Sequence, residues 1–295
     1  MRYNEQNGPK MTGEQIQAYL ARIGHTGPVT LDLAGLSAIH KAHQRTVPFE
    51  NLDILAGISL SLDHEALFDK IIIRRRGGVC AELNTLYNWL LYSLGFQVTS
   101  YNSRIITGEK IEFRRHRVLG VRFGDKTYTT DVGSTMEYAR MPLLLEEGLV
   151  QDDGSCRYRY DRHPIYGWVQ MQQKPGLDWA PVLGFTEEPQ LDVDFVTPLY
   201  WFEQHPASNM NKVPRVSYYT EDGILAIRAA AGSTKTRRLI ERAGIIVDAL
   251  DITSVEQEKT LIQELFGLPT DYGSRENFPP GMREASRKRA WAAWV

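Results

Sequence analysis

The apolar residues in the first third of the chain recur at the three- and four-residue spacing of amphipathic helices. One helix is expected after Thr12, which forms a capping-box pattern with Gln15, and Gly24 would end it. A second helix is expected with Thr30 as its cap, and a third from about Asp63 to Ile72. The stripes of the first two helices are Ile16, Tyr19, Leu20 and Ile23, and Leu33, Leu36 and Ile39. The pattern therefore predicts a mostly helical N-terminal region.

A further apolar stripe begins directly after a cysteine, Cys80, which follows Gly77-Gly78-Val79. The stripe consists of Leu83, Leu86, Tyr87, Leu90, Leu91 and Leu94, and Gly95 is a natural stop. Cys80 would therefore lie at a helix N-terminus, where unpaired N–H groups and the helix dipole favour the thiolate, the reactive form of cysteine. The two glycines would let another backbone or a substrate come close. For a cysteine taken alone, a buried apolar role is the commoner one, so other residues have to decide.

Beyond residue 95 the pattern changes to short extended runs that are typical of β-strands. Strands are expected at 96–103, 118–123 and 126–130. The last two flank Gly124-Asp125, which predicts a hairpin. His116 precedes the first strand of this hairpin, and Asp131 directly follows the second. If the strands pair, His116 and Asp131 lie near the same end of adjacent strands.

The remaining chain predicts more strands, a capped helix and a basic tail. The strands are expected at Arg157–Tyr160, Trp168–Gln172, Ala180–Phe185, Val213–Tyr219 and Ile224–Ala229. The helix begins after Ser254 and ends at Gly267, and a candidate surface helix runs from Arg283 to Trp294. We expect three regions, with a helical bundle at 1–95, a β-barrel at 96–195 and an α/β lid with its tail at 196–295.

The composition is that of an ordinary globular chain of 295 residues, 42% hydrophobic and 24% charged. The formal net charge of −2 argues against a nucleic-acid partner. The two cysteines, Cys80 and Cys156, do not make a disulfide framework. The first ten residues are polar, and no run approaches the ~20 apolar residues of a membrane span. We therefore expect a cytoplasmic protein without a membrane partner.

His40 and His43 stand at positions i and i+3, a spacing that suits a metal site. No cysteine or carboxylate cluster stands nearby in the sequence, so we expect no metal. Solvated or core-edge histidines are the favoured interpretation of this pair.

Cys80, His116 and Asp131 together have the residue types of a nucleophilic triad. The acid would orient the imidazole and stabilise its protonated form, and the imidazolium would stabilise the thiolate. The order cysteine, histidine, aspartate also matches the papain-like arrangement on different spacing, and such triads are defined by geometry rather than position.

The chain resembles the arylamine N-acetyltransferases from about Tyr19 to Phe266. The matching stretches are Tyr19-Leu20-Ala21-Arg22-Ile23-Gly24, Val47-Pro48-Phe49-Glu50-Asn51-Leu52, Arg75-Arg76-Gly77-Gly78-Val79-Cys80 with Glu82 and Asn84, His116, and Asp131-Val132-Gly133. The Arg-Gly-Gly-x-Cys and Pro-Phe-Glu-Asn-Leu motifs are highly specific in combination.

This resemblance implies an α+β fold of three lobes: an N-terminal helical bundle, a central antiparallel β-barrel and a C-terminal α/β lid, with a cysteine-protease-like catalytic core. It implies a catalytic triad of Cys80, His116 and Asp131. The implied reaction is ping-pong transfer of an acetyl group from the cosubstrate acetyl-CoA to an arylamine, arylhydrazine or related amine, without a metal. A role in xenobiotic metabolism and a monomeric or homodimeric state are also implied.

The resemblance further implies which residues contact the substrates. Members of the family often place a loop after the aspartate near the CoA pyrophosphate, so the donor is expected at Gly133, Ser134 and Thr135. The acceptor pocket is expected at Phe49, Ile105 and Ser134. Arg76 is expected to be structural, because its fork of donors can hold the turn before Cys80.

One departure from the family pattern concerns the acceptor. After Asp131-Val132-Gly133 the family usually continues with Phe-Gly, whereas this chain has Ser134-Thr135. The loss of the phenyl ring removes an apolar wall for an aromatic amine, and the loss of the glycine changes a place where CoA comes close. We therefore expect weaker use of simple anilines, or a larger or more polar acceptor.

Three alternatives stay open. The amide synthases of macrolactam biosynthesis share this fold and triad but take a polyketide chain from a carrier protein, and an open pocket at Ser134 is compatible with that. A cysteine hydrolase would use water as the acceptor. A non-enzymatic binding protein on the same scaffold is disfavoured, because all three triad positions are filled.

Overall fold

The computed structural model describes residues 8–106, 112–134, 138–221, 223–229, 233 and 235–270. Its α-helices are α1 (Gly13–Arg22), α2 (Leu33–Thr46), α3 (Leu52–Leu55), α4 (His64–Phe68), α5 (Cys80–Leu94), α6 (Val196–Gln204) and α7 (Val255–Phe266). A π-helical turn, Asp69–Ile73, continues α4, and a 3₁₀ turn, Asp192–Phe195, precedes α6. Thr135 and the candidate helix Arg283–Trp294 lie outside the described residues.

The N-terminal helices form where the sequence pattern predicts them. The capping box of α1 is present: the Thr12 hydroxyl accepts from the Gln15 amide, and the Gln15 side chain accepts from the Thr12 amide. The expected cap of α2 is wrong, because Asp32 and not Thr30 accepts a hydrogen bond from the Gly35 amide, at 2.8 Å. Thr30 instead donates to the Asp32 carboxylate, which stands three residues before Gly35 as a cap must.

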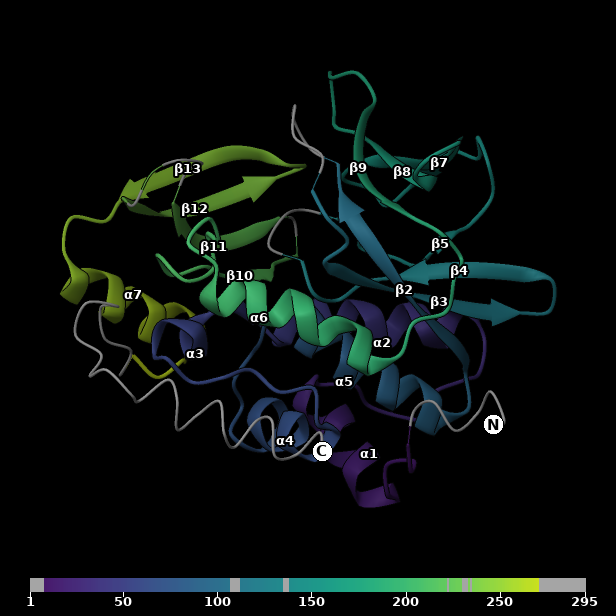
Figure 1. The fold of residues 1–295 in the computed structure, drawn as a ribbon, viewed down its shortest axis with the longest axis horizontal. Coiled ribbons are helices and arrows are strands. Elements are labelled where there is room, and N and C mark those ends of the chain that lie inside the picture. Colours follow the sequence, from purple (N-terminus) through teal and green to yellow (C-terminus); the bar gives the residue numbers. More distant parts are fainter. Residues whose placement is uncertain are drawn as a thin grey trace.

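Helix α5 is the centre of the molecule. Every residue from Cys80 to Leu91 is buried, including the polar ones, so this helix is covered on all sides and not only along a stripe. It packs against the strands β2 (Gln97–Ile105) and β3 (His116–Phe123), as Figure 1 shows. Gly95 ends it in the left-handed conformation with φ 110°, which a residue without Cβ adopts at little cost.

The middle of the chain forms the expected antiparallel barrel. Besides β2 and β3 its strands are β4 (Lys126–Thr130), β5 (Leu143–Leu144), β6 (Gln151–Asp152), β7 (Arg157–His163), β8 (Gly167–Gln173) and β9 (Ala180–Phe185). They follow the order β5-β4-β3-β2-β9-β8-β7-β6. The Gln151 side chain joins the two edges, because it accepts from the Leu144 amide at 2.7 Å and donates to the Leu144 carbonyl at 2.9 Å. The buried aromatic residues Tyr101, Tyr158, Tyr160, Trp168 and Phe185 fill the interior.

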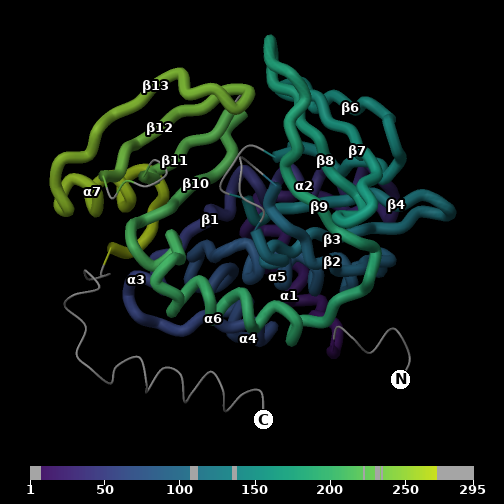
Figure 2. Tube along the Cα trace, turned by 45° about the horizontal axis from the view of Figure 1, so that its top comes forward, coloured from purple at the N-terminus to yellow at the C-terminus, as the bar shows by residue number. Residues whose placement is uncertain are grey.

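A second antiparallel sheet has the order β1-β10-β11-β12-β13. Its strands are β1 (Phe49–Glu50), β10 (Val216–Tyr219), β11 (Ile224–Ala229), β12 (Thr236–Arg242) and β13 (Ile245–Asp251). The sequence pattern predicts β10 and β11 but none of the others. Strand β1 lies beside β10 (Figure 2), and Phe49 is paired with Ser217. One strand from the N-terminal third thus completes a sheet of the C-terminal third.

Candidate active site

Cys80 is the first residue of α5 and is buried, with 5% of its surface exposed. The segment before it lies tightly against the chain around Pro48. A Cβ at Gly77 would lie 1.9 Å from the Pro48 carbonyl oxygen, and one at Gly78 would lie 2.8 Å from a Glu82 carboxylate oxygen. The expectation that another backbone comes close is therefore confirmed for Gly77, which lies against Pro48, whereas Gly78 makes room for the Glu82 side chain.

His116 and Asp131 meet as the hairpin predicts. Strands β3 and β4 pair in register from Phe123 opposite Lys126 to Leu119 opposite Thr130, which brings the two ends together. His116 Nε2 lies 2.5 Å from Asp131 Oδ2, and both side chains are buried. Because Nε2 is engaged by the carboxylate, Nδ1 is the ring nitrogen left for exchange with a third group.

The charges of this pair support each other. Burial by itself would raise the pKa of Asp131, but His116, together with hydrogen bonds from Asn84 and Gly133, holds that pKa below its usual value. Burial would lower the pKa of His116, but the charge and the hydrogen bond of Asp131 raise it to about 10. The nearby Cys80 adds to the increase in the His116 pKa. The structure thus brings Cys80, His116 and Asp131 together.

Asn84, one helical turn after Cys80, holds the carboxylate in place. Its Nδ2 donates to Asp131 Oδ1 at 2.8 Å and to the Arg117 carbonyl at 2.9 Å, and its Oδ1 accepts from the Val132 amide at 3.0 Å. In the sequence Asn84 was only a motif residue without a role. The four-residue spacing, which places Asn84 on the face of the helix that carries Cys80, is the signal in the sequence that could have indicated one.

Two residues of α2, Gln44 and His40, also contact the segment around Asp131. Gln44 donates to the backbone carbonyl of Asp131 at 3.1 Å and to that of Ala139 at 3.1 Å. His40 Nδ1 lies 2.6 Å from the Thr130 hydroxyl. Sequence reasoning missed Gln44, because no local pattern marks its partners.

The interpretation of His40 and His43 as solvated or core-edge residues is wrong. Their exposed fractions are 1% and 0%, and burial lowers the pKa of His40 to about 4 and that of His43 to about 3. Among the residues that the structure describes, no group of three or more His, Cys, Asp and Glu side chains could hold a metal ion.

Comparison with known proteins identifies the family. A family model described as N-acetyltransferase matches residues 32–274. An arylamine N-acetyltransferase of Mycolicibacterium smegmatis is 34% identical over 248 residues, which cover 80% of this chain and 89% of that protein. The chain belongs to the arylamine N-acetyltransferase family. The resemblance seen in the sequence is therefore confirmed, and the protein is an acetyltransferase.

Solved structures agree with this assignment. The arylamine N-acetyltransferase of Salmonella typhimurium superposes with a TM-score of 0.79 at 27% identity, over 96% of this chain and 99% of that chain. The Mycobacterium marinum enzyme in complex with CoA superposes with a TM-score of 0.77 at 26% identity, over 93% of this chain and 99% of that chain. These matches confirm the expected α+β fold.

The acetyltransferase holds the N-terminus of α5 with a buried cluster of charges. Arg76 contacts Glu50 at 2.8 Å and Asp53 at 2.7 Å. Lys70 contacts Asp53 at 2.8 Å and Glu82 at 2.9 Å. Glu82 in turn accepts from the Val79 amide at 3.0 Å, directly before the cysteine. The expectation that Arg76 is structural is confirmed.

This buried charge cluster contains three carboxylates and two cations. Burial would lower the pKa of Lys70, but Glu82 and Asp53 raise it, so the ammonium stays charged. Burial raises the pKa of Glu82 to about 7; the charge of Asp53 adds to the rise, and Lys70 opposes it.

The residues expected at the donor and acceptor lie at different depths. Gly133 is packed against α5: its amide donates to Asp131 Oδ1 at 2.9 Å, and a Cβ would lie 2.8 Å from Cys80 Cα. Ser134 is half-buried. Phe49 is buried in the same apolar cluster as Cys80, whereas the half-buried Ile105 packs on the barrel cluster.

Within the described part of the chain, no helix is long and apolar enough to cross a membrane.

Proposed function

We propose that the protein is an arylamine N-acetyltransferase that carries the acetyl group on Cys80 and transfers it to an arylamine, arylhydrazine or related amine. The observation that supports this most directly is the contact of Nε2 of His116 with Asp131 at 2.5 Å, beside a cysteine at the N-terminus of a buried helix. Cys80, His116 and Asp131 act as the catalytic residues.

In this proposal the resting enzyme holds Cys80 as a thiolate beside the imidazolium of His116. Two features favour that charge state. The N-terminal N–H groups of α5 stabilise a negative charge at its first residue. Asp131 raises the pKa of His116 to about 10, so the ring stays protonated at neutral pH. Asp131 also fixes the ring orientation, with Asn84 and the Gly133 amide holding its other oxygen.

Acyl transfer then takes two steps. The Cys80 thiolate attacks the acetyl carbonyl of acetyl-CoA, the C–S bond to CoA breaks, and the leaving thiolate takes the proton of His116. In the second step an amine attacks the acetyl-cysteine, His116 accepts the proton of the amine, and the Cys80 thiolate leaves. His116 is restored as the imidazolium, so atoms, charge and protons balance over the cycle.

Acetyl-CoA is proposed as the donor because the related M. marinum enzyme was solved in complex with CoA. Gly133, Ser134 and Thr135 are proposed to contact it. Phe49, Ile105 and Ser134 are proposed to line the acceptor pocket. The half-buried Ser134 stands where the family usually has phenylalanine, so the pocket lacks one apolar wall and admits a larger or more polar amine.

Intact-protein mass spectrometry after incubation with acetyl-CoA, without an amine, tests the proposal. We expect a mass increase of one acetyl group in the wild type and none in Cys80→Ala. Cys156→Ala is the matched control, because Cys156 is the other buried cysteine of the chain, and this variant should be acetylated like the wild type. Addition of an arylamine should then remove the acetyl group. Acetylation of Cys80→Ala, or retention of the acetyl group with every amine offered, would contradict it.

A further inference from the structure

A cavity of about 510 Å³ lies between α2, the barrel segment 140–155 and the turn that joins β10 to β11. The residues that line it include Lys41, Gln44, Arg45, Arg140, Asp153 and Glu221. Its volume is in the range of small-molecule sites. Each of the three parts of the chain that form it contributes polar groups, so the fold, and not one loop, creates the cavity.

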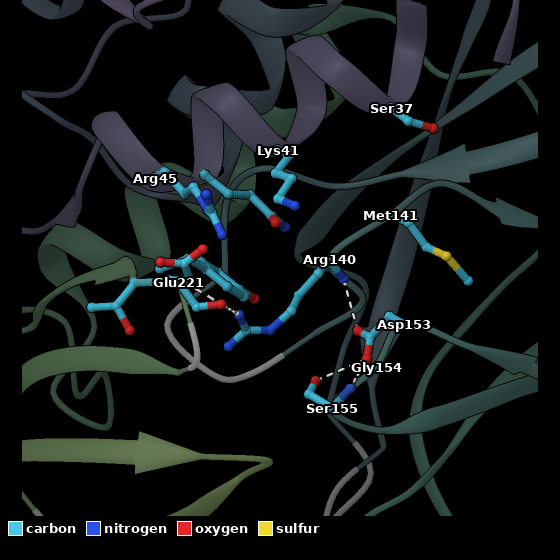
Figure 3. A pocket seen from close by; sticks show the side chains of 12 residues that line it. Ser37, Lys41, Arg45, Arg140, Met141, Asp153, Gly154, Ser155 and Glu221 are labelled. Atoms are coloured by element: carbon cyan, nitrogen blue, oxygen red, sulfur yellow. Dashed lines mark hydrogen bonds between the residues drawn. The ribbon is translucent and has the colours of Figure 1, made fainter. Parts of the chain in front are cut away.

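One face of α2 supplies positive charge to this cavity. Ser37, Lys41, Gln44 and Arg45 are separated by helical spacing and therefore lie on the same side of the helix. In Figure 3, Lys41 and Arg45 extend from the helix toward Arg140. Within the part of the chain that the structure describes, neither Lys41 nor Arg45 has an ion-pair partner. Two cations on the wall of a cavity are thus available to an anion.

The third cation is held rigidly on the opposite wall. Arg140 Nη1 donates to the Glu221 carbonyl at 3.0 Å and to the Thr220 carbonyl at 3.3 Å, and its guanidinium lies over the Tyr219 ring. The backbone amide of Arg140 donates to Asp153. A guanidinium fixed in this way needs no further ordering when a ligand binds.

Two of the described residues that line the cavity, Asp153 and Glu221, carry carboxylates. Asp153 is occupied, because it accepts hydrogen bonds from the amides of Arg140, Ser155 and Cys156 and from the Ser155 hydroxyl. Glu221 is exposed at the rim. Among the described residues that line the cavity, neither carboxylate is ion-paired with Lys41 or Arg45, and that of Asp153 is engaged by its own turn.

We propose that this cavity is a binding site for the phosphate groups of an anionic small molecule, with Lys41, Arg45 and Arg140 as the recognising cations. Arginine guanidinium groups and a lysine ammonium around one space are the donors that phosphate oxygens take, and the serine and threonine side chains at the wall suit a polar ligand.

The site is connected to the proposed catalytic residues through one side chain. Gln44 lines the cavity and donates to the Asp131 and Ala139 carbonyls. The phosphates of the acyl-CoA donor and those of a separate phosphorylated compound are the two sources of such a ligand. Only the first source rests on the proposed function, because the second requires no acetyl transfer.

Isothermal titration calorimetry with inorganic pyrophosphate tests the site directly. The wild type is compared with the double variant Lys41→Gln/Arg45→Gln and with the control Arg122→Gln/Lys126→Gln. The control removes the same charge from the exposed hairpin of β3 and β4, which does not line the cavity. We expect the cavity variant to bind pyrophosphate at least about tenfold more weakly, the loss for one charge-assisted contact, and the control to bind like the wild type. If the double variant does not fold, Lys41→Gln alone is used, since Lys41 is exposed.

Titration with CoA distinguishes the two sources. A parallel loss of CoA affinity in the cavity variant supports the site and assigns it to the donor. An unchanged CoA affinity with weakened pyrophosphate binding supports the site and assigns it to a separate phosphorylated compound. Absence of pyrophosphate binding in the wild type, or equal binding by all three proteins, overturns the proposal. Acetylation of Cys80 is measured on the same samples, so failure of the site and failure of the proposed function are told apart.

Discussion

Asn84 Nδ2 donates to Asp131 Oδ1 at 2.8 Å, and this hydrogen bond joins the helix of the cysteine to the hairpin of the histidine and the aspartate. The same Nδ2 donates to the Arg117 carbonyl, and Asn84 Oδ1 accepts from the Val132 amide. Asn84 therefore contacts both strand β3 and the segment that follows strand β4. The relative placement of Cys80 and His116 therefore depends on a residue that takes no part in bond making.

Asn84→Ala should reduce the rate of Cys80 acetylation by up to about 100-fold, because a reacting group displaced by about an ångström loses that much. Quenched-flow mass spectrometry with acetyl-CoA measures the rate. Asn102→Ala is the control: it removes a half-buried amide from β2, where Asn102 makes no contact with Asp131. Equal rates in the two variants would show that Asn84 does not position the carboxylate.

The His116–Asp131 pair predicts a loss of stability at alkaline pH. The pKa of His116 is raised from 6.5 to about 10 in the folded protein. The protonated ring therefore stabilises the fold fully below pH 6.5, and this contribution is lost as the pH rises to about 10. Urea unfolding of the wild type and of His116→Gln at several pH values measures it. The difference in unfolding free energy should shrink between pH 6.5 and 10, and a constant difference would contradict the raised pKa.

Arg76→Gln should destabilise the protein by about 3–5 kcal/mol, because it removes the ion-pair partner of the buried Glu50 and leaves Asp53 with Lys70 alone. Arg74→Gln is a matched control two residues away. Arg74 also pairs with an aspartate, Asp69, but both side chains are more than half exposed, so its loss should cost less than about 1 kcal/mol. Urea denaturation compares the two, and similar losses would argue against the buried charge cluster.

Gly133→Ala should destabilise the fold by about 1–3 kcal/mol, because the new Cβ would lie 2.8 Å from Cys80 Cα and 2.8 Å from Asn84 Nδ2. We also expect slower acetylation of Cys80, since the helix N-terminus must move. Gly13→Ala is the control, with nothing within 4 Å of its added Cβ. Thermal unfolding and acetylation are measured together; an unperturbed Gly133→Ala would rule out the tight packing of this glycine on α5.

Ser134→Phe should raise the turnover of simple anilines, because a phenyl ring restores the apolar wall that the family usually has beside the amine. Steady-state kinetics with a panel of anilines and larger polar amines measures the change. Ser134→Ala is the control for loss of the hydroxyl group alone. If Ser134→Phe leaves the preference among amines unchanged, position 134 does not determine the acceptor.

Elements with a clear local pattern were predictable from the sequence. Helix α5 follows from its apolar spacing and from Gly95, and the β3–β4 hairpin follows from Gly124-Asp125. The meeting of His116 and Asp131 also followed, because a two-residue turn determines which residues of its strands are neighbours.

Elements without such a pattern were missed. Strand β1 has only Phe49 and Glu50, and its partner β10 lies far along the chain. Strand β12 is rich in charged residues, and most of β13 is exposed, so neither shows the alternation of a half-buried strand. The cap of α2 was misplaced because Thr30 and Asp32 are both good capping residues and only backbone geometry selects between them.

The sequence by itself determined the family, the helical start and barrel middle of the chain, and the three residues proposed for the chemistry, because each depends on neighbours in the chain or on a specific motif. Only the tertiary structure decided which groups Gln44, Asn84 and Lys70 contact, how deeply His40 and His43 are buried, and that α2 and Arg140 enclose one cavity. Hydrogen bonds and ion pairs between distant segments depend on how whole elements pack, and a buried polar side chain bonds whichever partner that packing brings within about 3 Å.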